Sequence, residues 1–571
     1  MDADASRNSA VDRVADRYVD RLAALDPIAA TGFGVPGHDE QMPDLSPDGH
    51  AARADLDRAT LRELAEAQRS AETDATDEIT VAAMRERLGL RVERYEAGEI
   101  RRELNVLESP AQRLRDVFDL MPMQTPAQWA TVAARLSALP DALAGYRSSL
   151  AESARAGEVA ARRQVEQVAL QCGGFAAADG YFAGLLDQAE RCSEPVGSAV
   201  LADLRRGAIA AADAYDALAR YLREDLLERA PQADAVGADR YALASREFLG
   251  AVIDQRESYD WGRAELARIE DEMRVVAREL TGTDDVAAAM TALDEDPTRR
   301  IHGTDGLQAW MQELSDRTLS ELADTHFDIP EPVRRLDCRI APTHTGGIYY
   351  VPPTEDFSRP GTMWWSVPEG VEDFATWKEV TVVFHEGVPG HHLQCGQTVY
   401  RTAELNRWRR LDCWVSGHGE GWALYAERLM GELGYLDDPG ARMGMLDAQA
   451  LRAARVVVDI GVHLRLDAPA EVGAGTWDAD KAWTFLRGHT RVGDEMLRFE
   501  LDRYLGWPAQ APSYKVGERI WLQLRQDARA AAGSAFDLSA FHRRALDVGS
   551  LGLDVLRRVL APAADRPRPA S

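Results

Sequence analysis

Helix-forming residues dominate the chain from residue 10 to about 330, and this feature constrains the fold more than any other. Ala, Leu, Arg and Glu prevail there, and all of them favour helices. Apolar residues recur at spacings of three and four, as in Val11, Val14 and Tyr18. The segment carries no chemical motif. We therefore expect it to form an all-helical scaffold.

The pattern changes near residue 333, where short aromatic and β-branched runs lie between Gly and Pro residues. Residues 339–342 and 347–353 have this composition, which is typical of strands. We expect a short β-hairpin or edge-strand element here. The helical pattern returns at Phe374 and continues, with loops, to the end of the sequence.

The sequence thus predicts a mostly α-helical protein with a small β element. No Gly- or Ser-rich linker separates two halves. We expect a scaffold lobe over residues 1–330 and a catalytic lobe over residues 331–571, with a deep cleft. One continuous domain over residues 1–571 is the alternative.

Composition limits the function classes. The 571 residues carry a net charge of −28, which disfavours binding to nucleic acid or to an anionic membrane surface. Five cysteines without a C-x-x-C pair favour a reducing cytoplasm over a disulfide framework. Residues 1–6 lack the features of a signal peptide. No apolar run approaches the roughly 18 residues that a membrane span needs. We therefore expect a cytoplasmic protein without membrane partners.

Residues 385–392 contain three of the twelve histidines and one Glu. His385 is followed directly by Glu386, and further histidines come at His391 and His392. Zinc hydrolases use H-E-x-x-H, in which the two His lie one helical turn apart and the Glu is the general base. Here the second His comes two residues late. In a regular helix, neither later His would share a metal with His385.

Pro389 and Gly390 offer a way around this spacing. Pro389 must interrupt the helical hydrogen bonds, and Gly390 tolerates the backbone geometry that follows. If a bulge absorbs two residues, His391 returns to the place of the second zinc ligand. His392 would then face the substrate or support a ligand, and the sequence leaves open which of the two His binds metal.

A zinc site of this kind needs a third protein ligand. Glu420 and Glu427 are seven residues apart on a predicted helix and therefore share a face. Either carboxylate could bind the metal while the other orients a His. We favour Glu420 as the ligand, with Glu427 as the alternative.

A polar stripe lies on a predicted helix over residues 441–466. Arg452, Arg455, Asp459 and His463 fall on one face among apolar neighbours. Buried charges must be paired, so the stripe either lines a cleft or forms an internal ion-pair network. In the first case an Arg binds a substrate carboxylate and His463 stabilises an oxyanion.

A Pro-bounded loop precedes a further helix at residues 507–517. Tyr514 could donate a hydrogen bond to an oxyanion, and Lys515 could pair with a carboxylate. Taken alone, this segment is better explained as a structural loop.

Four motifs in this order resemble the bacterial family called domain of unknown function eight-eight-five. Weaker similarity extends the resemblance to nearly the whole chain. The motifs lie at residues 385–394, 420–427, 458–463 and 508–517, with further matches at 359–361 and 541–542.

That family resembles gluzincin-type zinc peptidases with deep clefts, such as angiotensin-converting enzyme and carboxypeptidase Taq. The resemblance implies a two-lobed helical body, metal-assisted amide hydrolysis, and an edge strand near residues 348–351, including Tyr350, that binds peptide backbone. This sequence differs from those peptidases by a two-residue insertion before His391. Dipeptidyl peptidase three, with one extra residue there, resembles a halfway case.

These observations predict a zinc-dependent hydrolase of short peptides. Zinc would be held by His385, His391 and Glu420, with Glu386 as general base. Two alternatives remain open: a peptide- or metabolite-binding protein with an absent or structural metal, and a zinc hydrolase of a non-peptide amide or ester. The sequence determines neither the substrate, nor exo- against endopeptidase action, nor the oligomeric state. The substrate-facing residues expected in the first case are Arg452, Arg455, Lys515, His392 and Tyr350, with His463 and Tyr514 as oxyanion donors.

Overall fold

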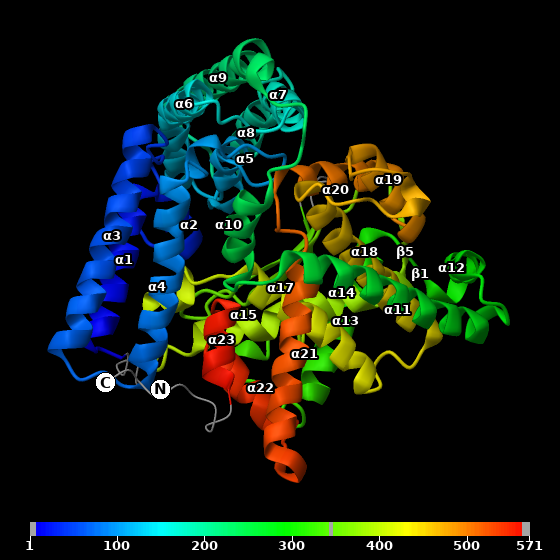
Figure 1. Cartoon of the computed structure of the whole chain (residues 1–571). Coiled ribbons are helices and arrows are strands. Elements are labelled where there is room, and N and C mark those ends of the chain that lie inside the picture. Colours follow the sequence, from blue (N-terminus) through cyan, green and yellow to red (C-terminus); the bar gives the residue numbers. More distant parts are fainter. Residues whose placement is uncertain (1–6, 342–346, 562–571) are drawn as a thin grey trace. The chain divides into compact units, whose positions relative to one another are not determined.

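The computed structural model describes residues 7–341 and 347–561 (Figure 1). Most of these residues lie in helices and the strands are few and short, as the sequence predicts. Three segments of the sequence analysis fall outside the described ranges: the first six residues, Pro342 and the tail from Pro562. No described helix combines the length and apolar character that crossing a membrane requires.

The chain forms two compact units. The N-terminal unit contains Asn8–Val236 and Arg498–Trp507, and the C-terminal unit contains Gly237–Leu497 and the chain from Pro508. The boundary in this part of the chain therefore lies at Val236, not near residue 330 as the sequence predicts. The helices between 237 and 330 belong with the C-terminal unit because they pack on its helices and strands rather than on the scaffold.

The N-terminal unit is built from helices alone. A buried apolar core forms between them, and α6 and α9 pack closely because Gly207 leaves space beside Leu136. The helices are α1 (Ala10–Leu25), α2 (Pro27–Phe33), α3 (Pro47–Ser70), α4 (Ala75–Glu96), α5 (Pro110–Asp116), α6 (Pro126–Arg155), α7 (Arg162–Phe175), α8 (Tyr181–Glu190) and α9 (Ser198–Tyr221), with most of α20 (Asp494–Gly506).

The C-terminal unit holds the remaining helices and all the strands of the described chain. Its helices are α10 (Ala238–Leu249), α11 (Gln255–Thr281), α12 (Val286–Glu295), α13 (Thr304–Leu322), α14 (Thr376–Glu386), α15 (His391–Tyr400), α16 (Arg407–Leu411), α17 (Ser416–Glu432), α18 (Pro439–His463), α19 (Ala479–His489), α21 (Ser513–Ala532), α22 (Leu538–Asp547) and α23 (Leu553–Leu560). Its strands are β1 (Arg300–His302), β2 (Leu336–Ile340), β3 (Ile348–Val351), β4 (Gly361–Trp365) and β5 (Asp373–Ala375).

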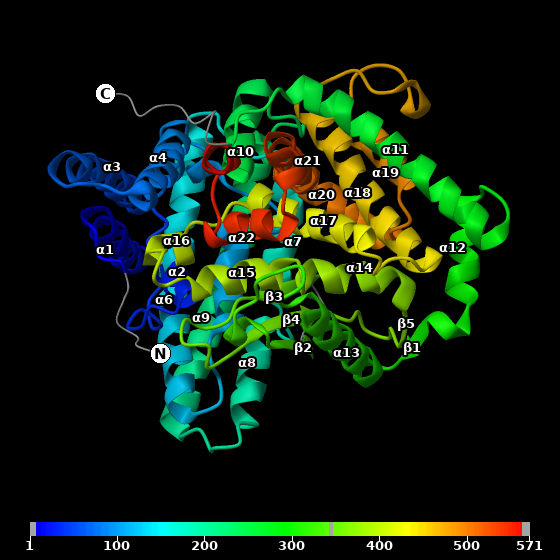
Figure 2. The ribbon, with the colours of Figure 1, turned by 90° about the horizontal axis from the view of Figure 1, so that it is seen from below.

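The small β element predicted near residue 333 is present. The strand order is β2-β4-β3, so the two predicted strands do not pair with each other. β4 lies between them, parallel to β2 and antiparallel to β3. The antiparallel hairpin is therefore formed by β3 and β4, and β3 is an edge strand. Figure 2 shows this sheet beside α13 and α15.

Glycines allow the helices of the C-terminal unit to pack closely. A Cβ added to Gly262 of α11 would lie 2.8 Å from the Val456 side chain of α18. A Cβ on Gly421 of α17 would lie 2.4 Å from the backbone of Gly517 on α21. These close contacts bring α11 against α18 and α17 against α21, and α17, α18 and α21 each contribute residues to the candidate site.

Candidate metal centre and active site

The His-Glu motif lies where two helices meet. α14 ends at Glu386 and α15 begins at His391. The prediction of one helix with an internal bulge is therefore wrong. The Gly390 N–H donates to the carbonyl of Phe384 at 3.1 Å, six residues back instead of the helical four. The two extra residues are therefore absorbed in a tight turn between the helices.

Gly390 is required by this turn. A Cβ at this position would lie 1.9 Å from the carbonyl oxygen of His385. The preceding carbonyl, that of Pro389, accepts a hydrogen bond from the Trp422 indole of α17 at 2.8 Å. The turn is thus fixed against both α14 and α17. It returns His391 to His385, and the centroids of the two imidazole rings lie 4.9 Å apart.

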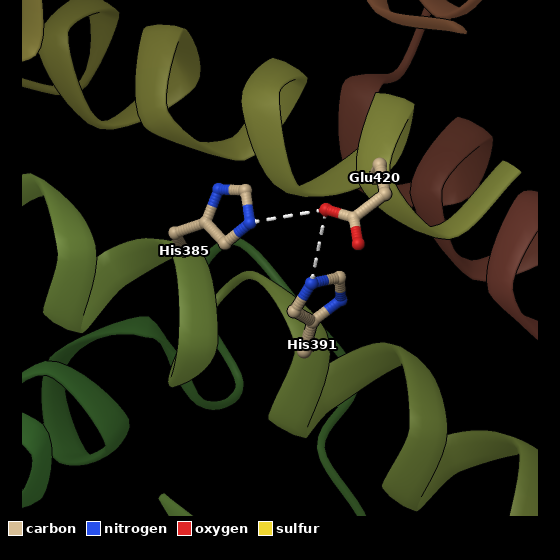
Figure 3. Close-up of side chains that lie close together, drawn as sticks. All are labelled: His385, His391 and Glu420. Carbon is tan, nitrogen blue, oxygen red and sulfur yellow. Dashed lines mark hydrogen bonds and ion pairs between the residues drawn. The ribbon is translucent and has the colours of Figure 1, made fainter. Parts of the chain in front are cut away.

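Both imidazoles face one carboxylate from α17. Nε2 of His385 lies 3.3 Å from Oε2 of Glu420, and Nε2 of His391 lies 3.5 Å from the same oxygen. One ligand atom from each of the three residues lies within 4.8 Å of the others. Figure 3 shows the three side chains converging from three helices. Two imidazole nitrogens and a carboxylate are a donor set that suits zinc with an open position.

Glu427 lies behind His385 rather than at this meeting point. Its Oε1 lies 2.7 Å from Nδ1 of His385, and its Oε2 accepts a hydrogen bond from the Thr381 hydroxyl at 2.9 Å. A carboxylate on Nδ1 fixes the orientation of a His whose Nε2 faces a metal. The geometry therefore favours Glu420 over Glu427 as the third donor.

The cluster is electrostatically coupled. Burial lowers the pKa of His385, but its hydrogen bonds with Glu420 and Glu427 outweigh burial and raise the pKa to about 10. Burial raises the pKa of Glu420, yet the His391 and His385 imidazoles hold it well below its usual range. The groups thus stabilise one another as an ion network, and a metal that binds here must displace a proton.

A cavity of about 490 Å³ contains this cluster. It also contains Glu386, whose pKa burial raises, with only partial opposition from the charges of His391 and His385. The cavity lies within the C-terminal unit. Its lining residues are Ile348, Tyr349, Tyr350, Pro352, His385, Glu386, His391, Cys395, Trp414, Glu420, Arg452, Arg455 and Tyr514.

The predicted polar stripe on α18 divides into two parts. Arg452 and Arg455 line the cavity, and the Arg455 guanidinium lies 5.2 Å above the ring of Tyr514. Asp459 accepts hydrogen bonds instead, from the Tyr241 hydroxyl at 2.7 Å and from a loop N–H at 3.0 Å. His463 is fully buried, its ring centroid lies 5.8 Å from that of Tyr241, and it does not line the cavity. The oxyanion role expected for His463 is therefore not supported by its position.

Lys515 also differs from the expectation. It is buried, and its Nζ forms ion pairs with Glu265 at 3.0 Å and with Glu518. Because neighbours on a helix point about 100° apart, Tyr514 can face the cavity while Lys515 faces α11. Lys515 thus joins two helices and does not contact the cavity.

His392 supports the cavity wall without lining it. Its Nε2 lies 2.7 Å from the carbonyl oxygen of Val333, so Nε2 carries the proton, and its Nδ1 accepts from the Tyr350 hydroxyl at 3.0 Å. Burial lowers the pKa of His392 to about 4, which keeps the ring neutral. A Cβ on Gly361 would lie 2.1 Å from the Tyr350 oxygen, so glycine there makes room for this contact. His392 therefore positions Tyr350, which does line the cavity.

The cavity has further lining residues outside the predicted edge strand and motifs, namely Pro352, Cys395 and Trp414. Cys395 follows His391 by four residues and so shares its helical face, a signal that was available. Trp414 precedes α17, and its ring covers the position where a Cβ on Gly419 would stand. No motif spacing indicates Trp414, because its contact depends on how that connection packs.

Two solved structures have a similar fold. A candidate lipoprotein from Colwellia psychrerythraea matches with a TM-score of 0.81 and 23% identity, over 96% of this chain and 98% of that chain. A candidate lipoprotein of unknown function from Shewanella oneidensis matches with a TM-score of 0.73 and 17% identity, over 96% of this chain and 99% of that one. At these identities the likeness extends to the fold alone. No curated protein matches the chain.

A family model described as "Bacterial protein of unknown function (DUF885)" matches residues 27–560. The match includes most of each compact unit and every residue of the cavity. The chain therefore belongs to the bacterial family of unknown function DUF885.

Proposed function

We propose that this chain is a zinc-dependent hydrolase that cleaves peptide bonds in short peptides. One observation carries the proposal. Donor atoms of His385, His391 and Glu420 lie within 4.8 Å of one another in a cavity that also contains Glu386. A donor set of two His and one Glu, with a further carboxylate beside it, is the composition of gluzincin-type peptidase sites.

The residues of the cavity have separate roles in this proposal. Zinc bound by His385, His391 and Glu420 would polarise the scissile carbonyl and lower the pKa of a water molecule. Glu386 takes a proton from that water and later delivers it to the leaving amine. The Tyr514 hydroxyl donates a hydrogen bond to the oxygen that becomes negative in the transition state.

Residues around the cavity support these roles. Glu427 orients His385 through Nδ1, and Thr381 holds Glu427 in turn. The tyrosine of the edge strand, Tyr350, is fixed by His392. Because β3 is an edge strand, it can offer backbone hydrogen-bonding groups to an extended peptide. This last feature favours a peptide over a small ester.

Metal content tests the proposal. Protein purified without chelator and supplied with zinc should hold about one zinc ion per chain, and His385→Ala should lose it. His302→Ala is the matched control, because His302 is an exposed histidine of β1 that pairs with Asp373. Zinc bound equally by both variants, or absent from the parent protein, would favour a binding protein over an enzyme.

Substrate class needs a second measurement. Mixed di- to pentapeptides, aryl esters and acyl anilides are incubated with the zinc-loaded protein, and products are identified by mass spectrometry. We expect cleavage of peptides that is abolished by chelation and restored by zinc. Cleavage confined to the esters or anilides would retain the zinc hydrolase and reject the peptide substrate.

A further inference from the structure

Two cationic side chains line the same cavity as the candidate metal centre. Arg452 and Arg455 lie three residues apart on α18, so they share one face of the helix. Arg455 is buried and lies against the ring of Tyr514. Arginine fits planar anions because its guanidinium presents paired N–H donors.

Arg452 has donor capacity that the protein does not use. Its Nη1 donates to the carbonyl of Ala448 on its own helix at 3.2 Å. Its Nε is buried and, within the ranges that the structure describes, has no hydrogen-bond partner. The carboxylates of Glu386 and Glu427 interact with the Arg452 charge, but neither accepts a hydrogen bond from Nε, so this N–H marks a position where a ligand completes the contacts.

We infer that Arg452, together with Arg455, binds a carboxylate of the substrate, and that this protein therefore selects peptides with a free C-terminal carboxylate. The inference deepens the proposed function and rests on it for the reaction. It adds an exopeptidase-type substrate class, which the sequence leaves open.

The size of the cavity supports a terminal carboxylate. A volume of about 490 Å³ lies in the range of pockets for small molecules. A peptide short enough to fit must bring its charged end into the cavity, and that end needs a cationic partner there. Glu386 and Glu420 lie in the same cavity and disfavour anions with more than one charge, such as phosphate.

Two exposed aromatic residues complete the walls. Tyr349 of β3 is 44% exposed and Trp414 is 48% exposed, and both line the cavity. Large exposed aromatic rings are suited to contact apolar side chains of a ligand. The probes below therefore contain apolar residues as well as a variable terminus.

Binding is measured first, with the Glu386→Gln variant, so that no turnover occurs. The probes are an equimolar library of tripeptides built from Ala, Leu and Phe, prepared as free acids and as C-terminal amides. We expect the free acids to bind about 10-fold more tightly or better, since a charge-assisted contact is lost in the amides. Equal binding of acids and amides would overturn the inference.

The same measurement is then made after Arg452→Met is added. We expect the preference for free acids to disappear, and Arg452→Lys to retain part of it because the charge remains. The matched control is Arg442→Met on the same helix, where Arg442 pairs with Glu279 away from the cavity. A preference that survives Arg452→Met would overturn the assignment, and the comparison of acids with amides stands even if that variant does not fold.

A carboxylate could also come from an acidic side chain. Amidated tripeptides that contain Asp or Glu are therefore compared with the same peptides containing Asn or Gln. Preference for the acidic side chains, lost in Arg452→Met, would support carboxylate binding and assign it to the side chain. Preference for the free terminus alone supports the exopeptidase.

Hydrolysis by the zinc-loaded parent protein separates the two proposals. If free acids are cut near the C-terminus and amides are not, both hold. If acids bind through Arg452 but no peptide is cut, only the proposed function fails. If acids and amides are cut equally, the hydrolase stands and the carboxylate inference fails.

Discussion

The two parts of the polar stripe on α18 meet different surroundings although their sequence spacing is the same. Arg452 and Arg455 face a cavity, whereas Asp459 and His463 face other side chains. The difference arises from α10 and the loop before α21, which cover the C-terminal part of the helix and supply Tyr241 and a backbone N–H. Helical spacing thus assigns residues to a face, and the neighbouring elements decide whether that face is a site or a core.

Adjacent residues on α21 repeat this contrast. Tyr514 lines the cavity, and Lys515 is buried in ion pairs with Glu265 and Glu518. We therefore expect substitutions of cavity residues to change metal binding or catalysis while stability is kept. Substitutions of the buried polar residues should lower stability and leave metal binding and catalysis unchanged.

The largest effect is expected for Glu386→Gln. Removing the general base should lower kcat/KM by about 10³-fold, or ~4 kcal/mol, because the water no longer has a proton acceptor. Zinc content and the urea unfolding curve should match the parent protein, since Gln has the same shape. Activity equal to that of the parent would reject the mechanism and place Glu386 with the structural residues.

Lys515→Met tests the buried side of the contrast. It leaves Glu518 and Glu265 without their common cation, and we expect a loss of about 3 kcal/mol in the free energy of unfolding. Zinc content should be unchanged. Lys378→Met is the control, because Lys378 pairs with Asp294 at 3.0 Å near the surface and should cost less than about 1 kcal/mol. If the Lys515→Met protein is stable and its substrate selectivity is altered, Lys515 contributes to the site and not to stability.

Glu427→Gln should have an intermediate effect on zinc affinity. Losing the negative charge on Nδ1 of His385 should weaken zinc binding by about 10- to 100-fold, measured by competition with a chromogenic chelator. Glu432→Gln, at the exposed end of the same helix, should bind zinc normally. If Glu427→Gln abolishes zinc binding while Glu420→Gln only weakens it, the roles of the two carboxylates are reversed.

The smallest effect is expected for Tyr241→Phe. Asp459 loses one of its hydrogen-bond donors, so the free energy of unfolding should fall by about 1 kcal/mol. The steady-state constants of the folded protein should not change, because Tyr241 and Asp459 lie outside the cavity lining. Urea titration and peptide assays on the same preparation measure both. A change in kcat without a change in stability would contradict the division of the stripe.

Much of the fold follows from local sequence. The long helix α11 ends at Thr281 and is followed by Gly282, whose φ of 77° suits the left-handed cap. α19 and α22 begin directly after Asp478 and Asp537, whose side chains accept hydrogen bonds from backbone N–H groups of the first turn, as N-cap residues do. The three-residue strand β1 was missed within a region read as helical, because it forms only by pairing with β5, distant in sequence.

The helices and the His-Glu and Glu motifs can be predicted from the sequence, since they depend on composition and on spacing within one element. Which polar residues share the cavity depends on how the elements pack. The turn at Gly390 brings His391, and not His392, next to His385. Glu420 faces Nε2 of His385, whereas Glu427 faces its Nδ1. On α18, Arg452 lines the cavity and His463 does not. The physical reason is that a polar side chain must find a partner, and that partner usually comes from an element that the local pattern cannot specify.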